Sequence, residues 1–174
     1  SPVKPEKLYL YENEFLSEED LKKLRYTKTP DKKFFLGLKA LIRNSEGKIL
    51  CLIPNKSRNF TGSIDLPGGR CEHRDKEEIH AVQREVFEEI GINITNIVFF
   101  DSFIFWDVSF NADPNPIGLT IRLYLADLPK DGVPKLKKEE HSSTIQWLWP
   151  GELADSLTQY PLSIREKVRS LEHR

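Results

Sequence analysis

A short acidic segment in the middle of the chain constrains the fold more than any other part of the sequence. Residues 84–92 read Arg-Glu-Val-Phe-Glu-Glu-Ile-Gly-Ile, so Glu85, Glu88 and Glu89 come just before Gly91. A glycine after a helix-forming run is typical of a helix C-terminus. The unpaired carbonyls there already carry partial negative charge, and carboxylates three or four residues apart repel each other. Such a helix therefore calls for a compensating cation, most simply a bound divalent metal ion.

The predicted helix has two distinct faces. Because a helix turns roughly 100° per residue, the three glutamates fall within an arc of about 100°. A neighbouring face carries an apolar stripe made of Ile79, Val82, Val86 and Ile90. The apolar face can pack on a core while the other presents hard oxygen ligands, which suit Mg²⁺ or Mn²⁺ and not zinc. The alternative, a solvated acidic face, is disfavoured because the acids lie at the helix end.

The acidic segment resembles the second half of the Nudix box, Arg-Glu-aliphatic-any-Glu-Glu-any-Gly-aliphatic. Every specified position of that pattern is matched by residues 84–92. Upstream, residues 66–69 read Leu-Pro-Gly-Gly and supply the glycine that opens the box. The resemblance covers residues 34–174 and is most specific over 66–92, with the box itself running from Gly69 to Ile92.

The first half of the box departs from the family pattern by one extra residue. We place that residue in the loop between Glu72 and Lys76. The position of the family's early glutamate then falls at Lys76 or Asp75, depending on the direction of counting. Its role passes to Asp75 or Glu77, or is lost.

The resemblance implies a fold and a reaction. The implied fold is α+β, a mixed β-sheet sandwiched between α-helices. The implied reaction is Mg²⁺-dependent (or Mn²⁺-dependent) hydrolysis of the pyrophosphate linkage in a nucleoside diphosphate derivative, such as a nucleoside triphosphate or a nucleotide sugar. A divalent ion on the phosphate oxygens would neutralise charge and lower the pKa of a bound water.

The resemblance also assigns roles to residues of the box. Glu85, Glu88 and Glu89 are the implied metal ligands, and one of them, or a loop glutamate, is expected to orient or deprotonate the attacking water. The backbone carbonyl of Gly69 is a further candidate ligand, because glycine lets the backbone approach an ion closely. Arg84 is expected to orient a carboxylate through an ion pair; the alternative is a surface arginine.

Three candidates lie outside the acidic helix. Arg70 and Glu72 follow the glycine turn and are predicted to bind substrate, with a solvated position as the alternative for each. Glu140 stands in a Glu140-His141 pair before the last predicted strand. Some family members carry an acidic base at about this distance, so Glu140 is a candidate catalytic residue, and a charged loop is the alternative.

Two other functional classes compete with the hydrolase. A non-hydrolytic Nudix-fold module that binds a nucleotide or RNA usually loses carboxylates of the box, whereas this chain keeps all three. An isomerase of isoprenyl diphosphates shares the fold but needs a catalytic cysteine in its own motif. Neither Cys51, in an apolar strand pattern, nor Cys71, in the glycine-rich loop, has that context.

The order of predicted elements agrees with an α+β fold. Strand patterns cover residues 34–42, 48–53, 64–66, 117–128 and 143–149, with one or two more strands between 93 and 110. Helix patterns run from about Asp75 or Lys76 to Gly91, and over 150–155 and 162–171. Residues 1–33 precede the resemblance and are predicted to form an N-terminal extension, a strand plus a short helix. This extension would pack on the main domain, 34–174, or on a partner subunit.

Composition narrows the choice of partner. The 174 residues carry a formal net charge of −1, which gives no electrostatic case for sequence-independent nucleic-acid binding. The basic run 135–138 is followed at once by Glu139 and Glu140 and is interpreted as a solvated loop. No apolar run predicts a membrane span or a signal peptide, so we expect a cytoplasmic location. The predicted partner is a small-molecule nucleotide, and a homodimer is left open.

Overall fold

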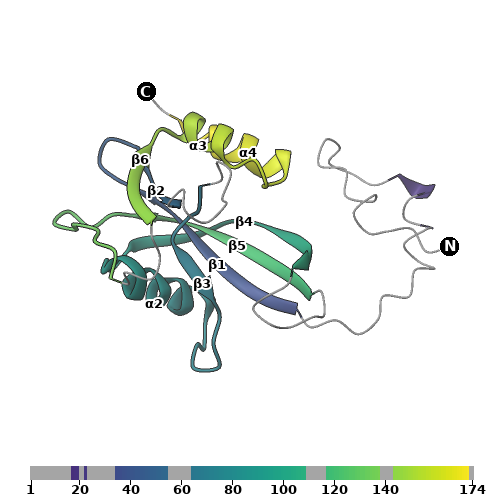
Figure 1. Cartoon of the computed structure of the whole chain (residues 1–174), viewed down its shortest axis with the longest axis horizontal. Helices are drawn as coiled ribbons and strands as arrows, with labels where there is room; N and C mark the ends of the chain where they lie inside the picture. The colour runs from purple at the N-terminus through teal and green to yellow at the C-terminus, as the bar shows by residue number, and fades with distance from the viewer. Residues whose placement is uncertain are drawn as a thin grey trace.

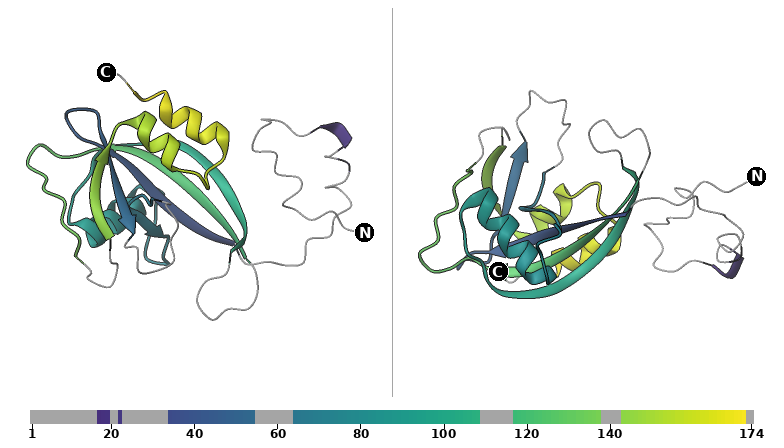
Figure 2. Two further views of the ribbon diagram at one scale, coloured as in Figure 1. Left: turned by 45° about the horizontal axis from the view of Figure 1, so that its top comes forward. Right: turned by 90° about the horizontal axis from the view of Figure 1, so that it is seen from below.

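A computed structural model describes residues 17–19, 22, 34–54, 64–108, 117–137 and 143–172. The strands are β1 (Phe34–Arg43), β2 (Ile49–Pro54), β3 (Gly68–Arg70), β4 (Thr95–Val108), β5 (Ile117–Asp127) and β6 (Ser143–Leu148). The helices are α2 (Glu78–Ile90), α3 (Pro150–Ser156) and α4 (Leu162–Arg169). The sheet lies between α2 on one face and α3 with α4 on the other (Figures 1 and 2). The predicted α+β sandwich is therefore confirmed. The predicted extension, residues 1–33, lies almost wholly outside the described residues.

The sheet is mixed, and β1 lies at its centre. The strand order is β4-β5-β1-β2-β6, and β3 pairs with β1 beside this path. β1 and β5 are parallel, from Phe34 opposite Gly118 to Arg43 opposite Asp127, whereas every other pair of these strands is antiparallel. Helices cover both faces of β1, which explains why its sequence is a nearly continuous apolar run.

Two hydrophobic cores flank the sheet. Successive side chains of a strand point to opposite faces, so β1 supplies Leu38, Ala40 and Ile42 to the core under α2 and Leu41 to the core under α3 and α4. The buried residues of α2 are Ala81, Val82, Val86 and Ile90. The predicted apolar stripe is thus correct except for Ile79, which lies in the first turn and keeps 42% of its surface exposed.

Helix α2 begins later than predicted but ends where predicted. It starts at Glu78, after an extended Glu77, and not at Asp75 or Lys76. The carboxylate of Asp75 cannot cap the helix because it accepts hydrogen bonds from Arg84 and from the backbone N–H of Glu72. Gly91 closes the helix in the left-handed conformation (φ 73°) and donates its N–H to the carbonyl of Phe87. Glycine is favoured there because a Cβ is strained at positive φ.

The segment after β5 caps the acidic end of α2. The backbone N–H of Lys135 donates to the carbonyl of Ile90 at 2.9 Å, and that of Lys137 donates to the carbonyl of Glu89 at 3.0 Å. The Lys137 ammonium also lies 4.0 Å from the centre of the Phe87 ring. Lys135 and Lys137 of the basic run are exposed, as predicted, and they also bring positive charge to the helix C-terminus, where such charge is stabilising.

The remaining strands follow the sequence pattern with one correction. Residues 64–66 do not form the predicted strand: Asp65 makes a single bridge with Leu52, and β3 begins at Gly68. Residues 95–108 form one long strand whose pairing with β5 is interrupted by bulges. None of the described helices is long and apolar enough to span a membrane.

Candidate metal and phosphate site

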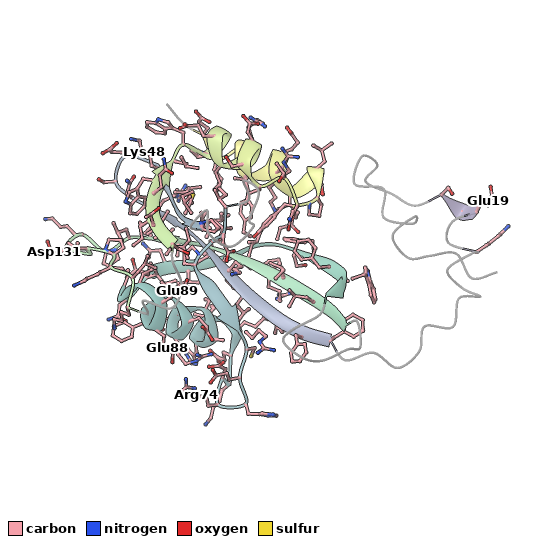
Figure 3. All side chains as sticks on the ribbon, in the orientation of Figure 1. Glu19, Lys48, Arg74, Glu88, Glu89 and Asp131 are labelled. Carbon is pink, nitrogen blue, oxygen red and sulfur yellow. The ribbon has the colours of Figure 1, made fainter. Side chains whose placement is uncertain are left out.

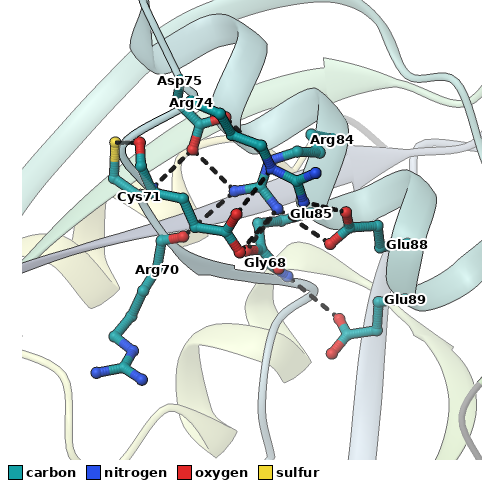
Figure 4. A network of polar contacts seen from close by, with 10 residues as sticks. Gly68, Arg70, Cys71, Arg74, Asp75, Arg84, Glu85, Glu88 and Glu89 are labelled. Carbon is teal, nitrogen blue, oxygen red and sulfur yellow. Dashed lines mark hydrogen bonds and ion pairs between the residues drawn. The ribbon is translucent and has the colours of Figure 1, made fainter.

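Two carboxylates of α2, those of Glu85 and Glu89, lie against the two glycines of β3. Figure 3 shows Glu88 and Glu89 on α2, and Figure 4 shows Glu89 beside Gly68. The Glu89 carboxylate accepts a hydrogen bond from the backbone N–H of Gly68 at 3.2 Å. The Glu85 carboxylate lies so close to Gly69 that a Cβ at that position would collide with it. Gly68 has φ +148°, and a Cβ there would collide with the backbone of Leu38. Gly68 therefore lets β3 approach β1 closely, and Gly69 lets the acidic helix approach β3.

Arg84 holds the carboxylates together. Its Nε and Nη2 donate to both oxygens of Asp75, at 2.9 and 2.8 Å. Its Nη1 donates to Glu85 and to Glu88, each at 3.0 Å. Only 16% of the Arg84 side chain and 4% of the Asp75 side chain are exposed. Asp75, and not Glu77, thus contacts Arg84, while the exposed Glu77 lies near His80.

This network shifts the protonation of its members. Hydrogen bonds from Arg84 lower the pKa of Asp75 to about 2, and those to Asp75 raise the pKa of Arg84. Burial raises the pKa of Glu89, against the opposing effects of the Lys39 ammonium and the Gly68 N–H. A divalent cation beside Glu89 would reverse that burial effect, because it stabilises the ionised carboxylate.

The loop with the extra residue adds a second arginine. Arg74 donates from Nη2 to Glu88 at 2.8 Å and lies 2.7 Å, through Nε, from the Glu72 carboxylate. The two oxygens of Glu88 are therefore bound by two different arginines. Arg74 is 61% exposed, so each of its ion pairs is weak in water.

The donor chemistry fits Mg²⁺ or Mn²⁺, but the side chains are arranged around arginine. The described residues contain no group of three His, Cys, Asp or Glu side chains already placed to hold a metal ion. Glu85 and Glu88 share the Nη1 of Arg84, while Glu89 binds Gly68. Their ionised oxygens are hard ligands. Rotation of Glu88 away from the arginines would make its carboxylate available to an ion.

Of the other predicted site residues, Glu72 joins the arginine network, Arg70 points away from it and Glu140 is not described. Glu72 lies between Arg74 and Arg84. Arg70 points away from the carboxylate network (Figure 4) and lies 4.9 Å from the Phe35 ring centre. Glu140 falls outside the described residues, which stop at 137 and resume at 143.

Two residues of this region, Arg74 and Lys39, were not predicted from the sequence. The sequence signal that could have pointed to Arg74 is the extra residue in the loop that contains it. Lys39 donates from Nζ to Asp65 at 3.3 Å and to the carbonyl of Leu66 at 3.2 Å. A lysine inside the apolar strand β1 could have been recognised, because lysine is rarely buried without a partner.

The two cysteines do not form a nucleophilic site. Cys51 is fully buried, and burial raises its pKa to about 12. Cys71 is partly buried, and burial together with Asp75 raises its pKa as well. A thiol with a raised pKa is a poor source of thiolate, which argues against the isomerase alternative.

The fold is a mixed β-sheet between helices. In the candidate site, a glutamate-rich helix packs on a strand that begins with Gly-Gly. The NUDIX domain family matches residues 33–169 of the sequence. The chain therefore belongs to the Nudix family.

Two curated relatives are similar over part of the chain. Nudix hydrolase 22, chloroplastic, of Arabidopsis thaliana is 27% identical over 132 residues, which are 64% of this chain and 42% of that protein. The 8-oxo-dGTP diphosphatase of Haemophilus influenzae is 33% identical over 75 residues, which are 43% of this chain and 54% of that protein. The matched region thus spans about half the length of these relatives.

Solved structures share the fold at low sequence identity. The MutT protein of Methanosarcina mazei has a TM-score of 0.58 at 22% identity, covering 82% of this chain and 97% of that one. The dihydroneopterin triphosphate pyrophosphohydrolase of E. coli has a TM-score of 0.57 at 17% identity, covering 78% and 92%. This likeness concerns the fold alone.

Proposed function

We propose that the protein is a pyrophosphohydrolase that uses Mg²⁺ or Mn²⁺ to cleave the phosphoanhydride of a nucleoside diphosphate derivative. The observation that carries this proposal is the packing of Glu85 against Gly69 and of Glu89 against Gly68, with Arg84 donating to both Glu85 and Glu88. The names of the two curated relatives, a Nudix hydrolase and an 8-oxo-dGTP diphosphatase, support the same class.

Residues of the chain would have separate roles in binding the ion and in positioning its ligands. Glu85, Glu88, Glu89 and the carbonyl of Gly69 would hold the ion, which would supply charge neutralisation and lower the pKa of a water. Arg84, fixed by Asp75, holds the carboxylates of Glu85 and Glu88 through hydrogen bonds from one nitrogen, Nη1.

The reaction then needs a proton acceptor and phosphate contacts. A carboxylate, Glu85, Glu88 or Glu140, accepts a proton from the water. The water oxygen bonds to one phosphorus while the bond from that phosphorus to the bridging oxygen breaks. Arg70 and Glu72, which follow β3, are the proposed contacts to substrate.

The test is hydrolysis of a nucleotide panel by the full chain, with Mg²⁺ or Mn²⁺ and then with excess chelator. The panel contains nucleoside triphosphates, 8-oxo-dGTP, ADP-ribose, NADH and a dinucleoside polyphosphate. We expect turnover only with metal, and a loss of about 100-fold or more for Glu88→Gln. The matched control is Glu77→Gln, which changes an exposed acid just before the same helix.

Two outcomes of this test would change the proposal. Equal activity of Glu88→Gln and Glu77→Gln would refute the proposed metal site. Tight nucleotide binding without turnover on the whole panel would instead support the nucleotide- or RNA-binding module. Size-exclusion chromatography of the same preparation tests whether the chain forms a homodimer, while the cytoplasmic location remains a prediction.

A further inference from the structure

The first turn of the acidic helix is tied to the sheet by a charged pair. Glu78, the first residue of α2, forms an ion pair with Arg122 of β5. The preceding residue, Glu77, occupies the N-cap position but makes no capping hydrogen bond with its side chain. The ion pair therefore joins an uncapped helix start directly to a strand next to the centre of the sheet.

Neighbouring side chains hold Arg122 in place. Its guanidinium lies over the Phe99 ring of β4, 4.5 Å from the ring centre. The hydroxyl of the buried Tyr124 is in hydrogen-bond contact with both Arg122 and Glu78. The side chains of Arg122 and Glu78 are only 31% and 34% exposed. Because a partly buried pair is screened less than a fully exposed one, this contact is stronger than an ordinary surface ion pair.

Glu78 and Glu85 lie on nearly the same side of α2. They are seven residues apart in the sequence, which places them within roughly 20° of each other around the helix and about 10 Å apart along it. Glu85 lies against Gly69 of β3, whereas Glu78 reaches β5. Contacts with two different strands at two levels of the helix limit both its rotation and its tilt. The position of Glu85 relative to β3 thus depends on the contact at the first turn.

We propose that the Glu78–Arg122 pair positions the acidic helix, so that the metal-binding carboxylates further along it meet a divalent ion with the correct geometry. Arg122 is a positioning residue, because it acts on the ion only through the helix. Such geometry must be held within about 0.5 Å, and partners behind metal ligands typically contribute about 10- to 100-fold in metal affinity. This inference rests on the proposed metal site and adds two residues to its support.

The sign of the effect of Arg122→Met on Mn²⁺ affinity tests the proposal. Removing a positive charge on the order of 10 Å from the ion would, by electrostatics alone, strengthen binding by about twofold in water. Loss of positioning has the opposite effect, so we expect the full chain to bind Mn²⁺ about 10-fold more weakly by electron paramagnetic resonance. Arg122→Lys keeps a charge that can pair with Glu78 and should lose less. An affinity equal to or above that of the wild type in folded Arg122→Met would overturn the proposal.

Controls separate positioning from a loss of stability. Arg169→Met removes an arginine that pairs with Asp155 at 2.6 Å on the helices across the sheet, and it should leave Mn²⁺ affinity unchanged. If Arg122 only stabilised the fold, Arg122→Met would lower the urea midpoint while its folded form bound Mn²⁺ as tightly as the wild type, which would refute positioning. The double variant Glu78→Gln/Arg122→Met should bind within about twofold of Arg122→Met, because the two residues form one contact. Losses that simply add would contradict the proposal.

A metal-free measurement separates the positioning role from the metal site. The backbone N–H of Gly68 donates to Glu89 at 3.2 Å, so its NMR signal reports how the helix packs on β3. In excess chelator, Arg122→Met should shift this signal and Arg169→Met should not. A shifted signal, with no Mn²⁺ binding by any form of the protein, would keep the positioning role and refute the metal site. A Gly68 signal that stays at its wild-type position in Arg122→Met would overturn the positioning role.

Discussion

Replacing Asp75 with asparagine tests whether the Asp75–Arg84 pair supports the site. Both oxygens of Asp75 accept from Arg84, and only 4% of the Asp75 side chain is exposed. The pair lowers the pKa of Asp75 from 3.8 to about 2. Since one pKa unit corresponds to roughly 1.4 kcal/mol, ionised Asp75 stabilises the fold by about 2 kcal/mol at neutral pH.

Removing one partner of a buried ion pair can cost roughly 3–5 kcal/mol when the other charge is left unpaired. Here Arg84 keeps Glu85 and Glu88 as partners. We therefore expect Asp75→Asn to lower the free energy of unfolding by about 2 kcal/mol at pH 7, close to the value from the pKa shift. Urea unfolding followed by tryptophan fluorescence, in excess chelator, measures this loss.

The pH dependence gives the sharper test. A carboxyl group whose pKa is lowered in the folded state contributes its full stability above its unfolded pKa and loses it as the pH falls through the folded pKa. The difference between wild type and Asp75→Asn should therefore be constant above about pH 5, roughly halved at pH 3 and nearly absent at pH 2. The exposed Asp155, paired with Arg169 at 2.6 Å, is the control, and Asp155→Asn should cost much less. A difference that stays the same from pH 7 to pH 3 would refute the assigned role of Asp75.

Three further substitutions act on the same site. Gly68→Ala would force a Cβ into the backbone of β1 and should cost about 2 kcal/mol or more in urea unfolding. Gly69→Ala would displace only the flexible carboxylate of Glu85, so we expect weaker Mn²⁺ binding by electron paramagnetic resonance, by about 10-fold or more, with little loss of stability. Arg74→Ala removes a cation that competes for Glu88 and should strengthen Mn²⁺ binding by up to about fivefold; unchanged affinity would show that this ion pair is open in solution.

Local patterns predicted most of the fold. Gly91 marked the end of α2 because a left-handed residue is favoured there, and the alternation of β5 and β6 marked strands whose bounds differ by one residue from those expected. The pairing of the strands was not accessible in this way. Nothing in the sequence pattern of β1 indicates that its parallel neighbour is β5.

The candidate site was only partly predictable, for a related reason. Spacing along a helix placed the three glutamates on one face, but it could not decide whether Asp75 or Glu77 reaches Arg84. That choice depends on the path of the loop before α2, where the Asp75 carboxylate also accepts the N–H of Glu72. Likewise, the contact of Arg70 with Phe35 joins segments that are far apart in the sequence.

The parallel pairing of β1 with β5 has a consequence for how the protein acquires its site. Residues 44–116 separate the two strands, and this stretch contains β3 and α2. During synthesis the central strand stays without this neighbour until residue 127 has been made, and β3, which supports the acidic helix, is itself paired to β1. Closing so long a loop is slow, so refolding should take roughly milliseconds to seconds. Stopped-flow experiments should show Mn²⁺ binding and native tryptophan fluorescence appearing in the same kinetic phase, because the metal site and the sheet are completed together.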